Sequence, residues 1–426
     1  MDTGSSLIIV SAFGRGHWLA AELAKEGLPV TLLDVTAQLG VWPPEDQEGP
    51  FGFFRNDRIS ESQIERLYSD DAFDENANGF TLWLKNGPLE CKGPMTSFSL
   101  EKNGLSNFVK EALAGDAASS KKAQQLNFKK NWLLQFAHQW ASTTFMPNAL
   151  GVKIADPLPL FSSFFNRQST RNGLEKSLAW LKTKGVQVIK PQAIRDCSFS
   201  SHSMISGLEM AAETQGIFKL ERLIWTLSSE ETYFLNEKLG KYFYPEGIVE
   251  SEWSWVRYRV ELQACSERDQ LPKHTLLIDD VESPWTHENM LVVQRTSLAD
   301  HFDIWMRIPS VQRFNKEYLK ERSERMLGKL LGKMERSQPE VRSFPQEYYY
   351  NYADLGPSRY PVYKNPPSVR AKKSGYKNLH LSGPEVWDQY SWGEYFEDDQ
   401  NTLATVLKWW KDKLLKEQKE RKETLS

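Results

Sequence analysis

A turn near the start of the chain carries residue types that can bind a phosphate group. Gly14, Arg15 and Gly16 follow an apolar run, and backbone N–H groups at 14–17 can form a nest for an anion. Arg15 can pair with the charge of that anion, although an exposed, solvated arginine is the alternative. Asp34 ends the next apolar run, where an acid can accept a hydrogen bond from a ribose hydroxyl. Together these residues predict a nucleotide site with the pyrophosphate at the start of a helix.

The sequence around the turn predicts the elements that would position these groups. Residues 7–12 form a continuous apolar run, as expected of a buried parallel strand. Residues 17–25 are expected to form a helix that ends at Gly27. His17 could donate a hydrogen bond to the phosphate, but we expect it to be a surface residue in the first turn of this helix. Residues 28–34 complete a βαβ unit, which predicts an α/β fold class with a Rossmann-like domain.

This opening resembles the FAD-dependent oxidoreductases of the amine oxidase, protoporphyrinogen oxidase and phytoene desaturase type. Those proteins begin with a strand, a G-x-G-x-x-G turn, a helix, a strand ending in an acid, and a Gly-Gly pair. The eleven residues from Gly16 to Gly27 and the six from Asp34 to Gly40 match the spacing of that pattern. The resemblance assigns no catalytic residue. It implies that FAD, if bound, contacts Gly14, Arg15, Gly16, Asp34, Gly40, Gly383 and Glu385.

Later segments extend the resemblance and imply a discontinuous Rossmann-like FAD/NAD(P)-binding domain. They are a glycine-led helix at 171–181, strands at 185–189, 220–227 and 378–383, and a closing helix at 399–418. The implied first domain comprises residues 1–80, 166–230 and 375–426. The implied second domain, of the substrate or cap type, comprises residues 81–165 and 231–374.

Five positions depart from the motifs of the resembled family: Ser11, Phe13, Val41, Pro384 and Glu397. Ser11 and Phe13 stand at the first two motif glycines, and Val41 stands at the second glycine of the Gly-Gly pair. The second motif glycine lets the backbone approach the pyrophosphate. A phenylalanine at that position is expected to place a large side chain where the phosphate oxygens should lie.

The departures near the C-terminal end point the same way. Pro384 follows Gly383 where the family has an acid that reaches FAD, and Glu385 could take over that role. Glu397 stands at the family's flavin-approaching glycine, and its charge would oppose the negative charge that builds on the reduced flavin. We therefore expect FAD to bind weakly or not at all.

A second register of the glycine motif starts at Gly14 and reads Gly14-Arg-Gly16-His-Trp-Leu19. It shortens the helix by about one turn and breaks the match between Gly16 and Gly27. We therefore give it less weight than the register that starts at Ser11.

The middle of the chain predicts a second domain with an antiparallel sheet and helices. Phe80 opens an alternating run that turns at Asn86-Gly87, which indicates a hairpin. Two helices are expected at 107–113 and 131–140. Strand-like segments without helices between them follow at 253–262, 274–279, 289–295 and 301–308. One long amphipathic helix is then expected at 314–334.

Composition and charge exclude several classes of protein. In the 426 residues, 53 Lys and Arg against 56 Asp and Glu give a net charge of −3, which excludes general nucleic-acid binding. Cys91, Cys197 and Cys265 lie far apart and form neither a disulfide framework nor a zinc site. The seven histidines lack metal-site spacing, and no G-x-S-x-G motif is present. Without a signal peptide or a membrane-length apolar window, we expect a cytoplasmic protein with no transmembrane segment.

Two functional hypotheses from different classes remain. We favour a flavin amine-oxidase-like protein with eroded FAD motifs, a non-catalytic or strongly divergent oxidoreductase homologue that acts as a binding or assembly protein. Its partner would be another protein or an apolar small molecule. The alternative is an active FAD-dependent oxidoreductase that oxidises an amine or an apolar C–C or C–N bond. Aromatic segments at 348–352, 360–363 and 387–396 could line a cavity, but packing is the simpler interpretation. The C-terminal helix is expected to dock on the Rossmann sheet and not on a membrane surface.

Overall fold

The structure is a computed structural model of the chain. It describes residues 7–12, 14–39, 53–54, 80–84, 87–91, 164–165, 171–211, 216–249, 253–261, 274–279, 288–295, 301–312, 315, 317–322, 324–325, 361–362, 375–383, 385 and 392–425. Several predictions fall outside these residues: the helices at 107–113 and 131–140, the aromatic segment at 348–352, and the motif positions Phe13, Gly40, Val41 and Pro384.

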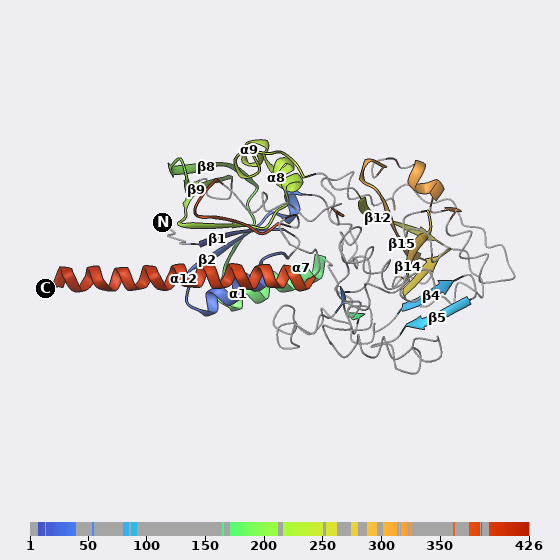
Figure 1. Ribbon diagram of the computed structural model, residues 1–426, viewed down its shortest axis with the longest axis horizontal. Helices are drawn as coiled ribbons and strands as arrows, with labels where there is room; N and C mark the ends of the chain where they lie inside the picture. The colour runs from blue at the N-terminus through green and yellow to red at the C-terminus, as the bar shows by residue number, and fades with distance from the viewer. Residues whose placement is uncertain are drawn as a thin grey trace, which may run out of the picture.

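A five-stranded parallel sheet forms the first unit (Figure 1). Its strands come from distant parts of the sequence and lie in the order β17-β11-β1-β2-β7, with every neighbouring pair parallel. This confirms the predicted Rossmann-like α/β fold. The strands are β1 (Leu7–Ser11), β2 (Val30–Asp34), β7 (Gln187–Ile189), β11 (Arg222–Trp225) and β17 (Leu379–Leu381).

Helices cover one face of the parallel sheet (Figure 1). They are α1 (His17–Lys25), α7 (Arg171–Thr183) and α12 (Trp392–Leu425). Successive side chains of a strand point to opposite faces. Leu7 and Ile9 therefore pack under these helices, whereas Ile8 and Val10 belong to the core on the other face. Burial on both faces explains why β1 is apolar at each position from Leu7 to Val10.

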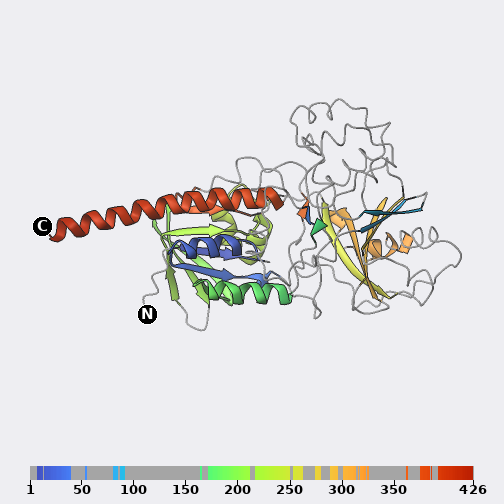
Figure 2. The same cartoon turned by 90° about the horizontal axis from the view of Figure 1, so that it is seen from below.

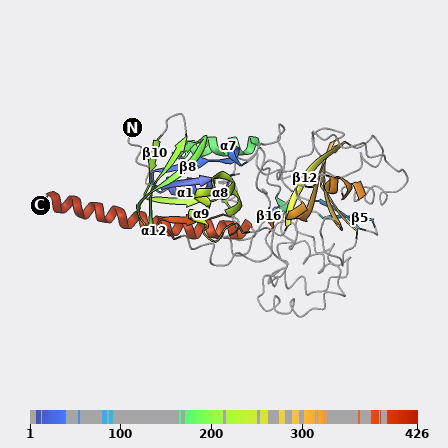
Figure 3. The same cartoon turned by 90° about the horizontal axis from the view of Figure 1, so that it is seen from above.

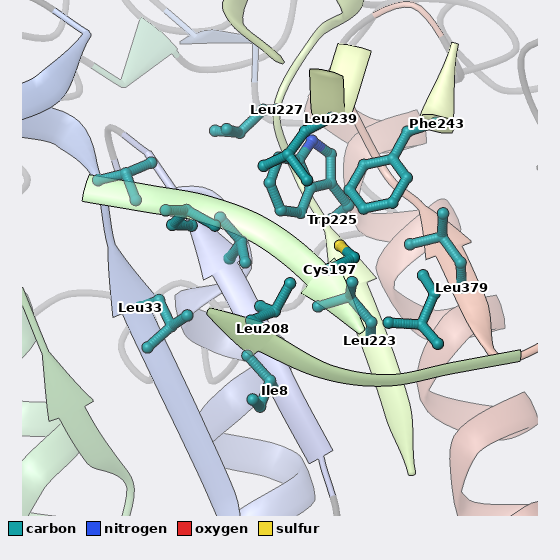
Figure 4. Packing of buried hydrophobic residues seen from close by; sticks show 14 of the residues in the cluster. Ile8, Leu33, Cys197, Leu208, Leu223, Trp225, Leu227, Leu239, Phe243 and Leu379 are labelled. Carbon is teal, nitrogen blue, oxygen red and sulfur yellow. The ribbon is translucent and has the colours of Figure 1, made fainter. Parts of the chain in front are cut away.

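An antiparallel sheet and two short helices cover the opposite face (Figure 1), and their side chains pack with those of the parallel strands in one core (Figure 4). The sheet contains β8 (Ala193–Ser201), β9 (Met204–Ala211) and β10 (Gly216–Lys219). The helices are α8 (Ser229–Leu235) and α9 (Glu237–Phe243). Trp225 of β11 packs edge-on against Phe243 of α9, with 4.7 Å between the ring centroids. Our sequence analysis did not predict these five elements.

A second, seven-stranded sheet lies apart from the first (Figure 1). Its order is β16-β12-β15-β14-β13-β4-β5, and its pairs are antiparallel except for the parallel pair β13 and β4. The predicted hairpin is confirmed as β4 (Phe80–Leu84) and β5 (Gly87–Cys91). The remaining strands are β12 (Trp253–Glu261), β13 (His274–Ile278), β14 (Met290–Arg295), β15 (His301–Pro309) and β16 (Pro361–Val362). Separately, β3 (Phe53–Phe54) pairs with β6 (Phe164–Phe165), and 317–322 and 324–325 are helical.

Helix α12 docks on the parallel sheet as predicted, but it is longer than the predicted 399–418. Val406 is fully buried in the core beneath α1 and α7, and the guanidinium of Arg222 lies 4.8 Å from the ring centre of Trp409. The last turns of α12 extend past the other elements (Figures 2 and 3). Residues 418–424 of these turns are all exposed.

The docked part of α12 and its exposed last turns are expected to contribute differently to the stability of the protein. A chain that ends after Glu417 loses only exposed turns, so its Tm should stay close to that of the full chain. Val406→Ala removes fully buried methyl groups and should lower the free energy of unfolding by about 1–3 kcal/mol. Thermal unfolding followed by circular dichroism tests both. A truncated chain less stable than Val406→Ala would contradict this account of docking.

Candidate functional site

The candidate site lies where two neighbouring parallel strands send the chain to opposite faces of the sheet. After β1 the chain enters α1 on one face, and after β11 it enters α8 on the other. β1 and β11 are paired side by side, so the two connections diverge at their carboxyl ends. Open α/β sheets bind ligands at such a switch point, outside the carboxyl ends of the strands.

Two glycines and one hydroxyl shape the turn between β1 and α1. Gly14 and Gly16 have φ angles of 82° and 75°, a left-handed conformation that favours glycine. The Ser11 hydroxyl donates a hydrogen bond of 2.6 Å to the carbonyl oxygen of Arg15. The Arg15 backbone N–H donates to the Ala12 carbonyl oxygen at 3.1 Å. Ser11 therefore closes the turn with its side chain at the position where the resembled family has a glycine.

Gly16 also lies where the start of helix α1 is close to the parallel sheet. A Cβ atom there would lie 3.0 Å from Thr226 Cγ2 and 3.2 Å from Ile9 Cγ2. Close helix–strand packing is the role of the third glycine in the dinucleotide-binding motif. This contact supports the register that starts at Ser11, because the register from Gly14 puts Leu19 at the third position.

Arg15 is buried, not solvated, and it forms an ion pair across the switch point. Only 8% of the residue is exposed. Its Nη2 donates to both carboxylate oxygens of Glu231 in α8, at 2.6 and 2.7 Å, and its Nε donates to the Ala12 carbonyl oxygen at 3.1 Å. Glu231 also accepts a hydrogen bond of 2.7 Å from the backbone N–H of Ser228. The pair therefore links the turn after β1 to the helix after β11.

Glu385 brings a second carboxyl group to the start of α8. The residue is fully buried, and its Oε1 accepts a hydrogen bond from the backbone N–H of Ser229. Its Oε2 is buried without a hydrogen-bond partner within the described part of the chain. Burial raises the pKa of Glu385 to about 7, and the nearby Glu231 charge acts in the same direction. Tyr244 lies in the same cluster and donates from its hydroxyl to the Leu227 carbonyl oxygen at 2.7 Å.

Asp34 stands at the carboxyl end of β2, as the sequence predicts for a ribose-binding acid. Its Oδ1 accepts hydrogen bonds from the backbone N–H and the hydroxyl of Thr36, at 3.2 and 2.6 Å. Burial raises its pKa. One oxygen of this carboxylate is therefore used to hold the local turn.

The described positions among the predicted site residues lie at or just beyond carboxyl ends of the parallel strands. They are Gly14, Arg15, Gly16, Asp34, Gly383 and Glu385, with the departure Ser11. The backbone of Glu397 lies in α12, and its side chain is outside the described residues, as are Phe13, Gly40, Val41 and Pro384.

The expectation that His17 is a surface residue was wrong. It is buried, with Nδ1 2.7 Å from the Ser177 hydroxyl of α7, so it joins two helices. Our sequence analysis also missed Glu231 and Ser228. A local signal was available, because Ser228 and Glu231 have the S-x-x-E spacing of a capping box, and the structure contains both of its hydrogen bonds.

Two kinds of feature are absent from the described residues: a group of metal ligands and a membrane-spanning helix. Within the described ranges, no group of three or more His, Cys, Asp or Glu side chains could hold a metal ion. None of the helices in the same ranges combines the length and the apolar character needed to cross a lipid bilayer.

Comparisons with known proteins identify the fold. No family model matches the sequence, and no curated protein matches it. An oxidoreductase from Methanosarcina mazei has a similar structure, with 13% identity, 93% of this chain and 99% of that chain covered, and a TM-score of 0.58. Wild-type putrescine oxidase bound to putrescine is similar with 12% identity, 95% and 99% coverage, and a TM-score of 0.52. These likenesses show that the chain shares its fold with an oxidoreductase and with a putrescine oxidase.

Gly383 supplies a matched test of the close packing at the site. A Cβ atom at Gly383 would collide with the Leu227 carbonyl oxygen and lie 2.8 Å from its carbonyl carbon. Gly383→Ala should therefore cost about 1–3 kcal/mol in the free energy of unfolding. Gly375→Ala is the control, because nothing lies within 4 Å of a Cβ there. Urea denaturation measures both, and equal stabilities of the two variants would contradict the predicted clash.

Glu385 should make the stability of the protein depend on pH. Its pKa is about 7 in the folded state against 4.5 as the ordinary value, so the folded state holds a proton that the unfolded chain releases. The stabilisation is complete below pH 4.5 and is lost as the pH rises through about 7. Glu385→Gln should therefore flatten the decline of Tm between these pH values.

Calorimetry across this pH range gives the difference between the two proteins. Glu237→Gln serves as the control, because Glu237 is exposed and pairs with Lys241 on the surface. Its profile should follow that of the wild-type chain. A Glu385→Gln profile that also follows the wild type would count against a buried, proton-holding carboxyl at this position.

Proposed function

We propose that this chain is a non-catalytic protein with the flavin amine-oxidase fold, which binds a protein partner or an apolar small molecule and does not use FAD. The observation that carries the proposal is the ion pair between Arg15 and Glu231 at the switch point. It is supported by the eroded motif positions Ser11, Phe13 and Glu397. The three cysteines lie far apart in the sequence and do not suggest a disulfide framework, which further favours the cytoplasm as the site of action.

The charges at the strand ends argue against a bound pyrophosphate. Asp34, Glu231 and Glu385 are buried carboxyl groups near the carboxyl ends of β2, β11 and β17. A dinucleotide would add two negative charges beside them, which would repel each carboxyl group that is ionised and would favour its protonated form. The one arginine of the turn already neutralises Glu231.

The groups that would hold FAD are already engaged within the chain. The Arg15 guanidinium binds Glu231 and Ala12, and the Ser11 hydroxyl binds the Arg15 carbonyl oxygen. Asp34 Oδ1 binds Thr36. A phosphate group of FAD would have to displace Glu231 from Arg15, and Asp34 keeps only one carboxylate oxygen outside the local turn. The described residues therefore do not fit FAD, and we derive no step of chemistry through a flavin.

The second candidate is an active FAD-dependent oxidoreductase that oxidises an amine or an apolar C–C or C–N bond. It is favoured by the packing of Gly16, by the place of Asp34 at the end of β2, and by the likeness to putrescine oxidase over 95% of the chain. A flavin would then supply the hydride acceptor.

Purification of the full chain separates the two candidates. The proposal predicts a colourless preparation, no flavin in the ligand released on denaturation, and no rise in Tm when FAD is added, because a ligand that does not bind the folded state cannot stabilise it. Absorbance spectroscopy, mass spectrometry and thermal unfolding test these expectations. A yellow preparation, or a Tm that climbs with FAD concentration, would overturn the proposal and favour the enzyme.

A further inference from the structure

We propose that Glu231 is an internal anion that takes the place of a phosphate group on Arg15. This inference rests on the proposed function and extends it. It names the group that occupies the anion-binding position on Arg15, and it names the class of ligand that would bind there if the Glu231 carboxylate were removed. The ligand class is a pyrophosphate or another phosphate-bearing molecule.

Arg15 and Glu231 lie on the two connections that diverge at the switch point. Arg15 belongs to the connection that leaves β1, and Glu231 belongs to the connection that leaves β11. In folds of this architecture a dinucleotide lies between the two connections that diverge at the switch point. The two residues are 216 positions apart in the chain, so their contact joins the two connections and not neighbouring residues of one element.

The Glu231 carboxylate is bound by donors that could also bind a phosphate group. Nη2 of Arg15 donates to both oxygens at 2.6 and 2.7 Å, and the Ser228 backbone N–H donates to Oε2 at 2.7 Å. A guanidinium combined with a backbone amide is a donor set that also suits phosphate oxygens. With 3% of the residue exposed, Glu231 is held there largely out of water.

The buried charge of Arg15 is balanced by the charge of Glu231. A buried cation requires a buried anion, because an unpaired charge inside a protein is strongly destabilising. Glu231 provides that anion from the chain itself and stays on Arg15 whether or not a ligand is present. If its charge is removed, Arg15 requires a counter-anion, and a small polyanion can supply it.

Glu231→Gln tests the inference directly. The full-length variant and the wild type are titrated with inorganic pyrophosphate in a calorimeter. We expect the variant to bind pyrophosphate about tenfold more tightly than the wild type, or better. The double variant with Arg15→Gln should return to wild-type behaviour, because its cation is gone. Glu237→Gln, which removes an exposed charge in α9, should behave as the wild type.

The outcomes separate this inference from the proposed function. A colourless wild type with no gain of affinity in Glu231→Gln overturns the inference and leaves the proposed function standing. A yellow wild type overturns the proposed function, whatever the variant does. If the double variant gains affinity as well, the anion binds elsewhere and the inference fails.

A second variant keeps the test decisive if Glu231→Gln does not fold. Glu231→Ala removes the carboxylate altogether and vacates its place, and it should also gain affinity for pyrophosphate. Pyrophosphate should raise the Tm of a variant that folds, and not that of the wild type. If neither variant folds, even with pyrophosphate present, the carboxylate is a folding element that no anion can replace, and the inference is overturned.

Discussion

The buried ion pair between Arg15 and Glu231 is the contact on which the arrangement of the site depends. Breaking such a pair by removing one partner costs about 3–5 kcal/mol, because the remaining charge is left in a medium that solvates it poorly. The intact pair therefore fixes α8 relative to the turn after β1. Two connections that the topology sends to opposite faces are held together by charge.

The ion pair is the centre of a longer polar network that joins three strand ends. From β1, Ser11 closes the turn that presents Arg15; from β11, Ser228 and Ser229 bind the carboxylates of Glu231 and Glu385 through their backbone amides. From β17, the chain reaches Glu385 through Gly383. A side chain at 383 would collide with Leu227, so the network also constrains a backbone position that has no polar side chain.

The sequence predicted the elements whose signal is local. A continuous apolar run marked β1 because both of its faces are buried, and α1 spans the predicted residues 17–25. β8, β9 and β10 were missed, since their polar outer faces and short turns weaken the pattern. The partner of Arg15 could not be read, because no periodicity links two residues 216 positions apart. For the division into domains, we propose the predicted one with α8 and α9 added to the first, since they share its core.

A fold of this kind can form without a bound ligand, provided that the chain itself supplies the packing and the charge balance that the site requires. Apolar clusters on both faces of the parallel sheet stabilise the strands from side chains alone. The remaining requirement is electrostatic, because the turn after β1 carries a buried guanidinium. Glu231 meets that requirement from α8. On the proposed function, this counter-charge from the chain replaces the charge that a bound phosphate would supply.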